Sequence, residues 1–107
     1  MKEPTLGNPQ NTIAVLQKYN FVFQKKFGQN FLIDTHVLDK IIRAAEIGKD
    51  DCVLEIGPGI GTMTQYLACA AKKVIAVEID RALIPILEDT LDGYDNVKII
   101  NEDVLKV

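Results

Sequence analysis

The sequence has few of the residues that build disulfide frameworks, metal sites and membrane spans. Its 107 residues include two cysteines and one histidine, and no apolar run approaches the length of a membrane span. Charges and a proline stand near the N-terminus, where a signal peptide would have its apolar core. Cys52 and Cys69 lack C-x-x-C spacing and a histidine partner, so we expect reduced, mostly buried thiols in a cytoplasmic protein. His36 has no acid or cysteine at ligand spacing, which predicts a surface position and no metal site.

The composition is that of an ordinary globular domain, but the charge is uneven. The chain is 48% hydrophobic and 25% charged, and its length allows one small domain with a modest core. Residues 1–34 hold four basic and two acidic residues, whereas residues 35–107 hold eight basic and thirteen acidic ones. This division predicts an N-terminal arm at 1–34 and the main domain at 35–107. A basic arm on an acidic domain suggests that the arm meets an anion.

The most informative stretch is Val-Leu-Glu-Ile-Gly-Pro-Gly-Ile-Gly at residues 53–61. Its branched apolar residues predict a strand, and the glycines at 57, 59 and 61 predict the turn that follows. Because glycine has no Cβ, a ligand can lie against bare backbone at this turn. Residues 62–71 look helical, so strand, turn and helix N-terminus together predict a ligand cradle. A turn without a ligand is the weaker interpretation, since three glycines would then cost entropy without benefit.

The glycine spacing separates two classes of ligand. The dinucleotide fingerprint G-x-G-x-x-G would need a glycine at position 62, where the chain has Thr62. The pattern present is E-x-G-x-G-x-G, which resembles motif I of the class I S-adenosylmethionine-dependent methyltransferases. Glu55 suits a ligand with an ammonium and a sulfonium group and would repel a pyrophosphate. A dinucleotide remains the main rival ligand.

Two further predicted strands carry acids at their ends. Residues 73–79 are apolar along most of their length, as a strand covered on both faces requires, and Glu78 lies near the tip. An acid there accepts hydrogen bonds from ribose hydroxyls in doubly wound folds, which fits either ligand. Residues 97–101 predict a third strand, and Asp103 beyond it is placed to accept from the amine of an adenine. Pro85 lies too deep in the intervening helix, so we expect a kink or a separate opening turn.

The arm is predicted to contain a short helix. Residues 1–7 have no pattern and are expected to be disordered. Asn8 and Pro9 predict the start of this helix, and Asn20 its end. A second helix is expected from residue 34 or 35 until Gly48.

An aromatic and basic stretch separates these two helices. Residues 21–32 contain four phenylalanines and two lysines. Lys25 and Lys26 suit phosphates while aromatic rings stack on unpaired bases, which predicts a surface for single-stranded or loop RNA. Alternatively, the phenylalanines fasten the arm to the sheet and the lysines are merely solvated. Both interpretations can hold together.

Taken in order, the motifs resemble those of the ribosomal RNA adenine dimethyltransferases. They are Gln-Asn-Phe-Leu-Ile-Asp at 29–34, Leu-Glu-Ile-Gly-Pro-Gly-Ile-Gly at 54–61, Val-Glu-Ile-Asp at 77–80 and Glu-Asp-Val at 102–104. The resemblance implies the N-terminal half of a class I, Rossmann-like α/β fold, with parallel strands and helices on both faces. It also implies dimethylation of adjacent adenines in small-subunit ribosomal RNA, in ribosome biogenesis, with S-adenosyl-L-methionine as the cofactor.

The resemblance further implies which residues hold the cofactor. From its methionine end to its adenine end they are Asn30, Leu32, Gly57, Gly59, Glu78, Ile79, Asp103 and Val104. The first two would close over the methionine, with Gln29 beside them, and the two glycines would line the sulfonium side. The acid at 78 would hold the ribose. Residues 103 and 104 would hold the adenine, whose ring would pack against the isoleucine at 79.

The sequence departs from the family at the site of the target base. Family members carry an Asn-Leu-Pro-Tyr type motif after a fourth strand, where it receives the flipped adenine, and this sequence has no such tetrapeptide. We therefore expect a truncated piece with much of the cofactor site, no catalytic residue and no activity alone. Because the first strand lacks its neighbour, its open edge is expected to permit self-association. The alternatives are a non-catalytic nucleic-acid-binding relative and an NAD-dependent oxidoreductase.

Overall fold

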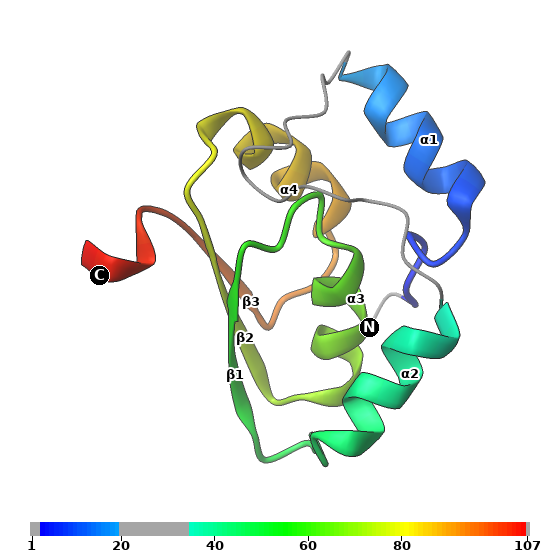
Figure 1. Cartoon of the computed structure of the whole chain (residues 1–107), viewed down its shortest axis with the longest axis vertical. Helices are drawn as coiled ribbons and strands as arrows, with labels where there is room; N and C mark the ends of the chain where they lie inside the picture. The colour runs from blue at the N-terminus through cyan, green and yellow to red at the C-terminus, as the bar shows by residue number, and fades with distance from the viewer. Residues whose placement is uncertain (1–2, 20–34, 107) are drawn as a thin grey trace.

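A computed structural model describes residues 3–19 and 35–106 of the chain (Figure 1). It has helices and strands in alternation after two N-terminal helices. In chain order the elements are α1 (Pro9–Lys18), α2 (Thr35–Ala44), β1 (Cys52–Ile56), α3 (Thr62–Ala70), β2 (Lys73–Glu78), η2 (Arg81–Leu83), α4 (Ile84–Thr90), β3 (Val97–Asn101) and η3 (Val104–Lys106). None of the helices within these two ranges is long and apolar enough to cross a membrane.

The three strands form one parallel sheet in the order β1-β2-β3. Ile56 at the end of β1 pairs with Val77, and Glu78 at the end of β2 pairs with Asn101 at the end of β3. The carboxyl ends of all three strands therefore meet at one edge of the sheet, which is where α/β folds bind ligands. This arrangement confirms the predicted Rossmann-like half.

The helices cover one face of this sheet (Figure 1), where α3 contacts β2 and α4 contacts β3. Between helices and sheet lies the core, in which Val74 of β2 is fully buried. On the opposite face, Leu54 and Ile56 of β1 are 59% and 61% exposed. The described part of the chain thus has one of the two helical layers expected for the complete fold.

The predicted helix starts follow from capping and proline chemistry. The Asn8 side chain accepts from the Gln10 N–H at 2.9 Å, and a proline lies in the first turn of α1, as predicted. Asn20, the predicted end of this helix, lies outside the described residues. Ahead of α4, the Asp80 side chain accepts from the Ala82 N–H at 3.0 Å and opens the short helix η2. The expected separate opening turn is confirmed, since it leaves Pro85 in the first turn of α4.

The prediction that Gly48 ends the second helix was wrong. The helix ends at Ala44, and Glu46 takes the left-handed conformation with φ of 55°. The Ile47 N–H then donates to the Ile42 carbonyl at 3.4 Å, which closes the helix end. Glu46 thus occupies the left-handed position that glycine more often takes at a helix end.

The expected disorder of residues 1–7 was wrong for the part that is described, residues 3–7. The Thr5 and Leu6 N–H groups both donate to the Gln65 side-chain oxygen at 2.9 Å, and Leu6 is 3% exposed. Further along, the Tyr94 hydroxyl donates to the Glu3 carbonyl at 2.8 Å. This segment has no pattern of its own because its partners lie about sixty to ninety residues away in the chain.

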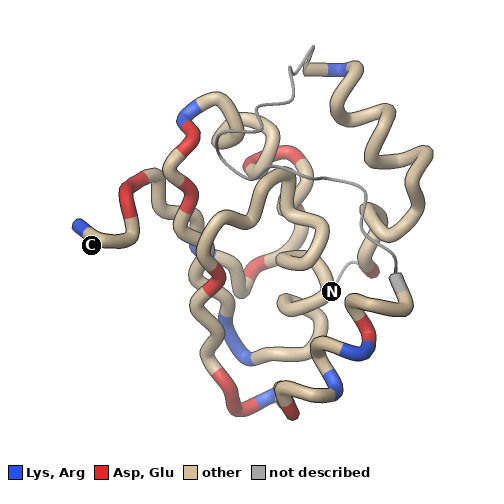
Figure 2. Tube along the Cα trace, viewed as in Figure 1, with Lys and Arg blue, Asp and Glu red and all other residues tan. Residues whose placement is uncertain are grey.

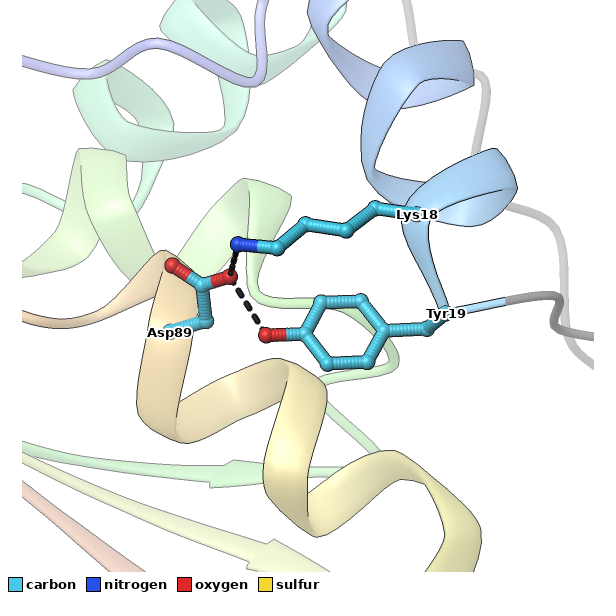
Figure 3. A network of polar contacts seen from close by, with 3 residues as sticks. All are labelled: Lys18, Tyr19 and Asp89. Atoms are coloured by element: carbon cyan, nitrogen blue, oxygen red, sulfur yellow. Dashed lines mark hydrogen bonds and ion pairs between the residues drawn. The ribbon is translucent and has the colours of Figure 1, made fainter.

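The end of α1 is joined to α4 by a shared carboxylate (Figure 3). Lys18 Nζ and the Tyr19 hydroxyl lie 2.7 Å and 2.5 Å from the same oxygen of Asp89. The hydrogen bond to Asp89 raises the pKa of the Tyr19 phenol and that of the Lys18 ammonium. Residues 3–19 are therefore docked on α3 and α4 at both of their ends.

The two cysteines differ from their predicted burial. Neither forms a disulfide, but Cys52 is exposed and Cys69 is half-buried. Cys52 lies two residues before Leu54 on β1, so both side chains lie on the same sheet face, which no described helix covers. His36 is exposed, as predicted.

Candidate functional site

The glycine turn between β1 and α3 has three residues in the left-handed region. Gly57, Gly59 and Gly61 have φ values of 69°, 64° and 96°. The Gly57 N–H donates to the Val77 carbonyl at 2.9 Å, and the Gly59 N–H donates to the Glu78 carboxylate at 3.1 Å. The turn is therefore fastened to the end of β2, the neighbouring strand.

The first and last of these glycines have different surroundings. A Cβ built on Gly57 would meet nothing within 4 Å. A Cβ on Gly61 would lie 3.0 Å from the Thr90 hydroxyl and 3.3 Å from the side chains of Leu87 and Leu91. Gly57 thus presents bare backbone to open space, as a ligand cradle requires, whereas Gly61 lets α4 pack against the turn.

Glu78 is a buried and fixed carboxylate. It is 4% exposed, and its two oxygens accept from the Gly59 N–H at 3.1 Å and the Asp80 N–H at 3.0 Å. The Asn101 side chain donates to the Glu78 backbone carbonyl at 2.8 Å, which joins β3 to the same point. Each carboxylate oxygen has two acceptor positions, so both retain capacity to accept from a ligand hydroxyl. A merely solvated acid is excluded by this burial.

Glu55 lies in β1 beneath the same turn. The Thr64 hydroxyl of α3 donates to its carboxylate. Burial raises the pKa of Glu55 to about 7, with the charge of Glu78 adding to the rise and the Thr64 hydrogen bond opposing it. A cation bound beside Glu55 would stabilise its charged form, so this carboxyl responds to the charge of a ligand.

The residues predicted to bind adenine lie at the same sheet edge. They make fewer contacts with one another than the glycine turn makes with Glu78. Ile79 follows Glu78 and is 53% exposed, a large apolar side chain at the tip of β2. Asp103 and Val104 are half-buried and follow β3. Asp103 accepts from the Leu105 N–H at 3.0 Å and so caps η3. The structure thus joins Gly59 to the Glu78 carboxylate and Gly57 to the neighbouring Val77 carbonyl, and places Asp103 beyond the adjoining strand.

Two predicted site residues, Asn30 and Leu32, lie outside the described residues together with Gln29. Across residues 3–19 and 35–106, no three His, Cys, Asp or Glu side chains are grouped so that they could hold a metal ion. The acidic segments at the ends of β2 and β3 lie on the same side of the molecule (Figure 2). This negative sheet edge suits a ligand with positive charge and is unfavourable for a pyrophosphate.

Three polar residues behind the turn were missed by the sequence analysis. Thr64 holds Glu55, Thr90 donates to the Ile60 carbonyl, and Gln65 binds the N-terminal segment. The local sequence does not single them out, since Thr64 and Gln65 are adjacent polar residues in α3 and Thr90 follows two acids in α4. All three are buried in the structure.

Comparison with protein families and curated proteins gives consistent matches. The family model for ribosomal RNA adenine dimethylase matches residues 20–107. Over 103 residues the chain is 76% identical to the ribosomal RNA small subunit methyltransferase A of Lachnoclostridium phytofermentans, covering 95% of this chain and 36% of that protein. Its counterpart in Alkaliphilus metalliredigens is 59% identical over 100 residues, covering 94% and 35%. The chain therefore spans about a third of the length of these relatives.

Solved structures give the same fold. A dimethyladenosine transferase from Plasmodium falciparum is similar with a TM-score of 0.62 and 42% identity, over 67% of this chain and 27% of that one. The 23S rRNA methyltransferase ErmE is similar with a TM-score of 0.67 and 40% identity, over 73% of this chain and 32% of that one. Both likenesses cover only part of the larger proteins, as the curated relatives do.

Proposed function

Because this chain belongs to the ribosomal RNA adenine dimethylase family, we propose that it provides part of the cofactor site of an S-adenosylmethionine-dependent methyltransferase. The parent protein would dimethylate adjacent adenines of small-subunit ribosomal RNA in the cytoplasm. The observation that carries this proposal is the open backbone at Gly57 beside the buried Glu78 carboxylate, at the ends of two neighbouring parallel strands. The names of the curated relatives support the small-subunit substrate.

The residues present fit the chemical groups of S-adenosylmethionine. Bare backbone at Gly57 gives room for the methionine and sulfonium part, because a Cβ built there would meet no atom within 4 Å apart from its chain neighbours. Glu78 would accept from the ribose hydroxyls with the acceptor positions that Gly59 and Asp80 leave. Ile79, half exposed, would pack against the adenine ring.

Residues at the adenine end and at the methionine end of the cofactor complete the proposed site. Asp103 would accept from the exocyclic amine of the adenine, and Val104 would pack beside it. Asn30 and Leu32 would close over the methionine, by resemblance to the family. When bound, the cofactor supplies a methyl group activated by its sulfonium for transfer to the amine of the target adenine.

Electrostatics supports a positively charged ligand at this place. Glu55 has a pKa of about 7 because it is buried, and the charge of Glu78 adds to the rise. A sulfonium and an ammonium nearby favour the carboxylate form of Glu55, so cofactor binding releases a proton near neutral pH. Binding of a dinucleotide would add negative charge to the same edge and is opposed by it.

We also propose that these 107 residues are inactive on their own. They contain no Asn-Leu-Pro-Tyr type tetrapeptide to receive the target base, so no catalytic residue is assigned here. Contact of Lys25 and Lys26 with ribosomal RNA remains a prediction, since both lie outside the described residues. In the parent protein, mass spectrometry of digested small-subunit RNA should find dimethyladenosine after incubation with S-adenosylmethionine. Unmodified RNA would instead favour a non-catalytic RNA-binding relative.

The bare sheet face and the edge of β1 support self-association of this chain. Leu54 and Ile56 are more than half exposed on a strand that pairs with β2 on one side only within the described sheet. An edge strand with exposed apolar side chains is a template for pairing with another copy.

The experiment that tests the cofactor proposal is a calorimetric titration of the chain with two ligands. We expect weak, saturable binding of S-adenosylhomocysteine and no binding of NAD. Gly93 also has a positive φ, of 89°, but lies in the loop before β3. Gly93→Ala places a methyl group on a glycine with positive φ outside the proposed site, so as a control variant it should retain binding of S-adenosylhomocysteine. Saturable binding of NAD without a response to S-adenosylhomocysteine would contradict the proposal.

A further inference from the structure

Thr90, the last residue of α4, is hydrogen-bonded to the glycine turn at Ile60. Its hydroxyl donates to the Ile60 carbonyl at 2.6 Å, and Thr90 and Ile60 are 7% and 1% exposed. A Cβ on Gly61 would approach the same hydroxyl to 3.0 Å, so α4 is in direct contact with the turn. The turn is thus fixed at Ile60 and Gly61, while Gly57 faces open space.

Gln65 joins Thr90 to the N-terminal segment. This side chain is fully buried, and its nitrogen donates to the Thr90 carbonyl at 2.8 Å. Its oxygen accepts from the Thr5 and Leu6 N–H groups, both at 2.9 Å. One buried amide therefore connects the Thr90 carbonyl with the Thr5 and Leu6 N–H groups, and it does so from inside α3, the helix that begins at the turn.

Further contacts keep the N-terminal segment in place. The Thr12 hydroxyl of α1 donates to the Leu6 carbonyl at 3.1 Å, and Thr12 is 1% exposed. At the other end of α1, Lys18 and Tyr19 bind Asp89, the residue before Thr90 (Figure 3). Residues 3–19 thus contact α4 next to the point where α4 holds the turn.

We propose that Thr90 is a positioning residue for the cofactor turn, and that Gln65 makes the shape of this turn depend on the docking of residues 3–19. This inference deepens the proposed function and rests on it for the identity of the ligand. A backbone cradle binds its ligand only if its N–H and carbonyl groups keep their orientations. A buried carbonyl is held in its orientation by the donor that hydrogen-bonds to it, because leaving it unpaired costs free energy. Losing the Thr90 hydroxyl would therefore loosen the turn, although Thr90 does not line its open side.

Amide hydrogen exchange in the unliganded chain tests the first part. The reporters are the amides of Gly59 and Gly61, with the Val74 amide of β2 as the reference for global unfolding. In Thr90→Val, which keeps the shape but removes the donor, we expect the turn amides to exchange about tenfold faster. Thr90→Ser, which keeps the hydroxyl, should remain within about twofold of the wild type. Turn amides that stay unchanged while Val74 exchanges faster would assign Thr90 to global stability alone and overturn the proposal.

Gln65→Met tests the link to the N-terminal segment, with Gln17→Met on the exposed part of α1 as the matched control. We expect faster exchange of both the Leu6 amide and the turn amides in the first variant, and no change in the second. Faster exchange at Leu6 with an unchanged turn would refute the link. These readouts need no cofactor, so a chain that binds no S-adenosylhomocysteine contradicts the proposed function and leaves this test valid.

Discussion

Alanine substitutions at Gly57 and Gly61 separate the two tasks of the glycine turn. Both residues have positive φ, 69° and 96°, so a side chain strains the backbone at either place. Only at Gly61 would the new methyl also meet neighbours, at 3.0 Å and 3.3 Å. Gly57→Ala and Gly61→Ala are therefore a matched pair that differs mainly in packing.

The expected losses of stability follow from these contacts. Gly57→Ala should lower the free energy of unfolding by about 1 kcal/mol, which is the strain of an L-residue in the left-handed region. Gly61→Ala should lower it by about 3 kcal/mol, since overpacking against Thr90 and two leucines adds about 2 kcal/mol to the strain. Urea unfolding followed by circular dichroism measures both values.

Ligand binding should show the opposite order. The methyl of Gly57→Ala would occupy the open space proposed for the cofactor, so we expect the affinity for S-adenosylhomocysteine to fall at least about tenfold despite the small loss of stability. Gly61→Ala, measured at a temperature where it is folded, should bind with a smaller loss. The reasoning is refuted if Gly57→Ala binds like the wild type, or if the two variants lose equal stability.

The remaining predictions concern charge, the sheet edge and the thiols. Burial raises the pKa of Glu55 from 4.5 to about 7, so the folded chain favours the protonated acid. The stabilisation of the folded chain by protonated Glu55 is fully present below pH 4.5 and is lost as the pH rises through about 7. We expect a loss of about 3 kcal/mol in urea unfolding over this interval, and Glu55→Gln should lack that slope. Equal slopes in both proteins would disprove the assignment. In sedimentation velocity the wild type should self-associate with rising concentration, whereas a Leu54→Lys, Ile56→Lys variant should stay monomeric; a wild type that is monomeric at every concentration would argue against an open edge. The exposed thiol of Cys52 should react with a thiol reagent faster than Cys69, whose pKa is raised by burial, and equal rates would contradict the described exposures.

Much of the fold could be predicted from the sequence because it depends on interactions between neighbouring residues. The strand at residues 97–101 and the start of α1 after Asn8 agree with their predicted positions, since apolar runs and capping residues act on their own neighbours. The opening turn before Pro85 follows in the same way, because proline cannot continue a helix interior.

Two of the failures originate in distant partners, whereas the end of α2 is closed by a local hydrogen bond from Ile47 to Ile42. Residues 3–7 were expected to be disordered, but an amide at Gln65 binds them. The exposure of Cys52 depends on which sheet face the helices cover, and a pattern along one strand does not reveal this. The left-handed residue that ends α2 is Glu46, two residues before the expected Gly48.

The sequence predicted the glycine motif of the site, but not the burial and the hydrogen bonds that fix it. The pattern of alternate glycines indicated bare backbone, which the structure has at Gly57. The carboxylate of Glu78 was expected at a strand tip, yet its burial and its bond to Gly59 depend on the pairing of two strands. Thr90 and Gln65 could not be found, because their partners are backbone groups that the sequence does not distinguish.

The most direct test of the cofactor site is the change in backbone amide NMR shifts when S-adenosylhomocysteine is added to the isotopically labelled chain. We predict the largest shifts at Gly57, Gly59 and Ile79, smaller ones near Asp103, and none at Gly93. Shifts that avoid the ends of β1 and β2, or that arise with NAD instead, would contradict the account.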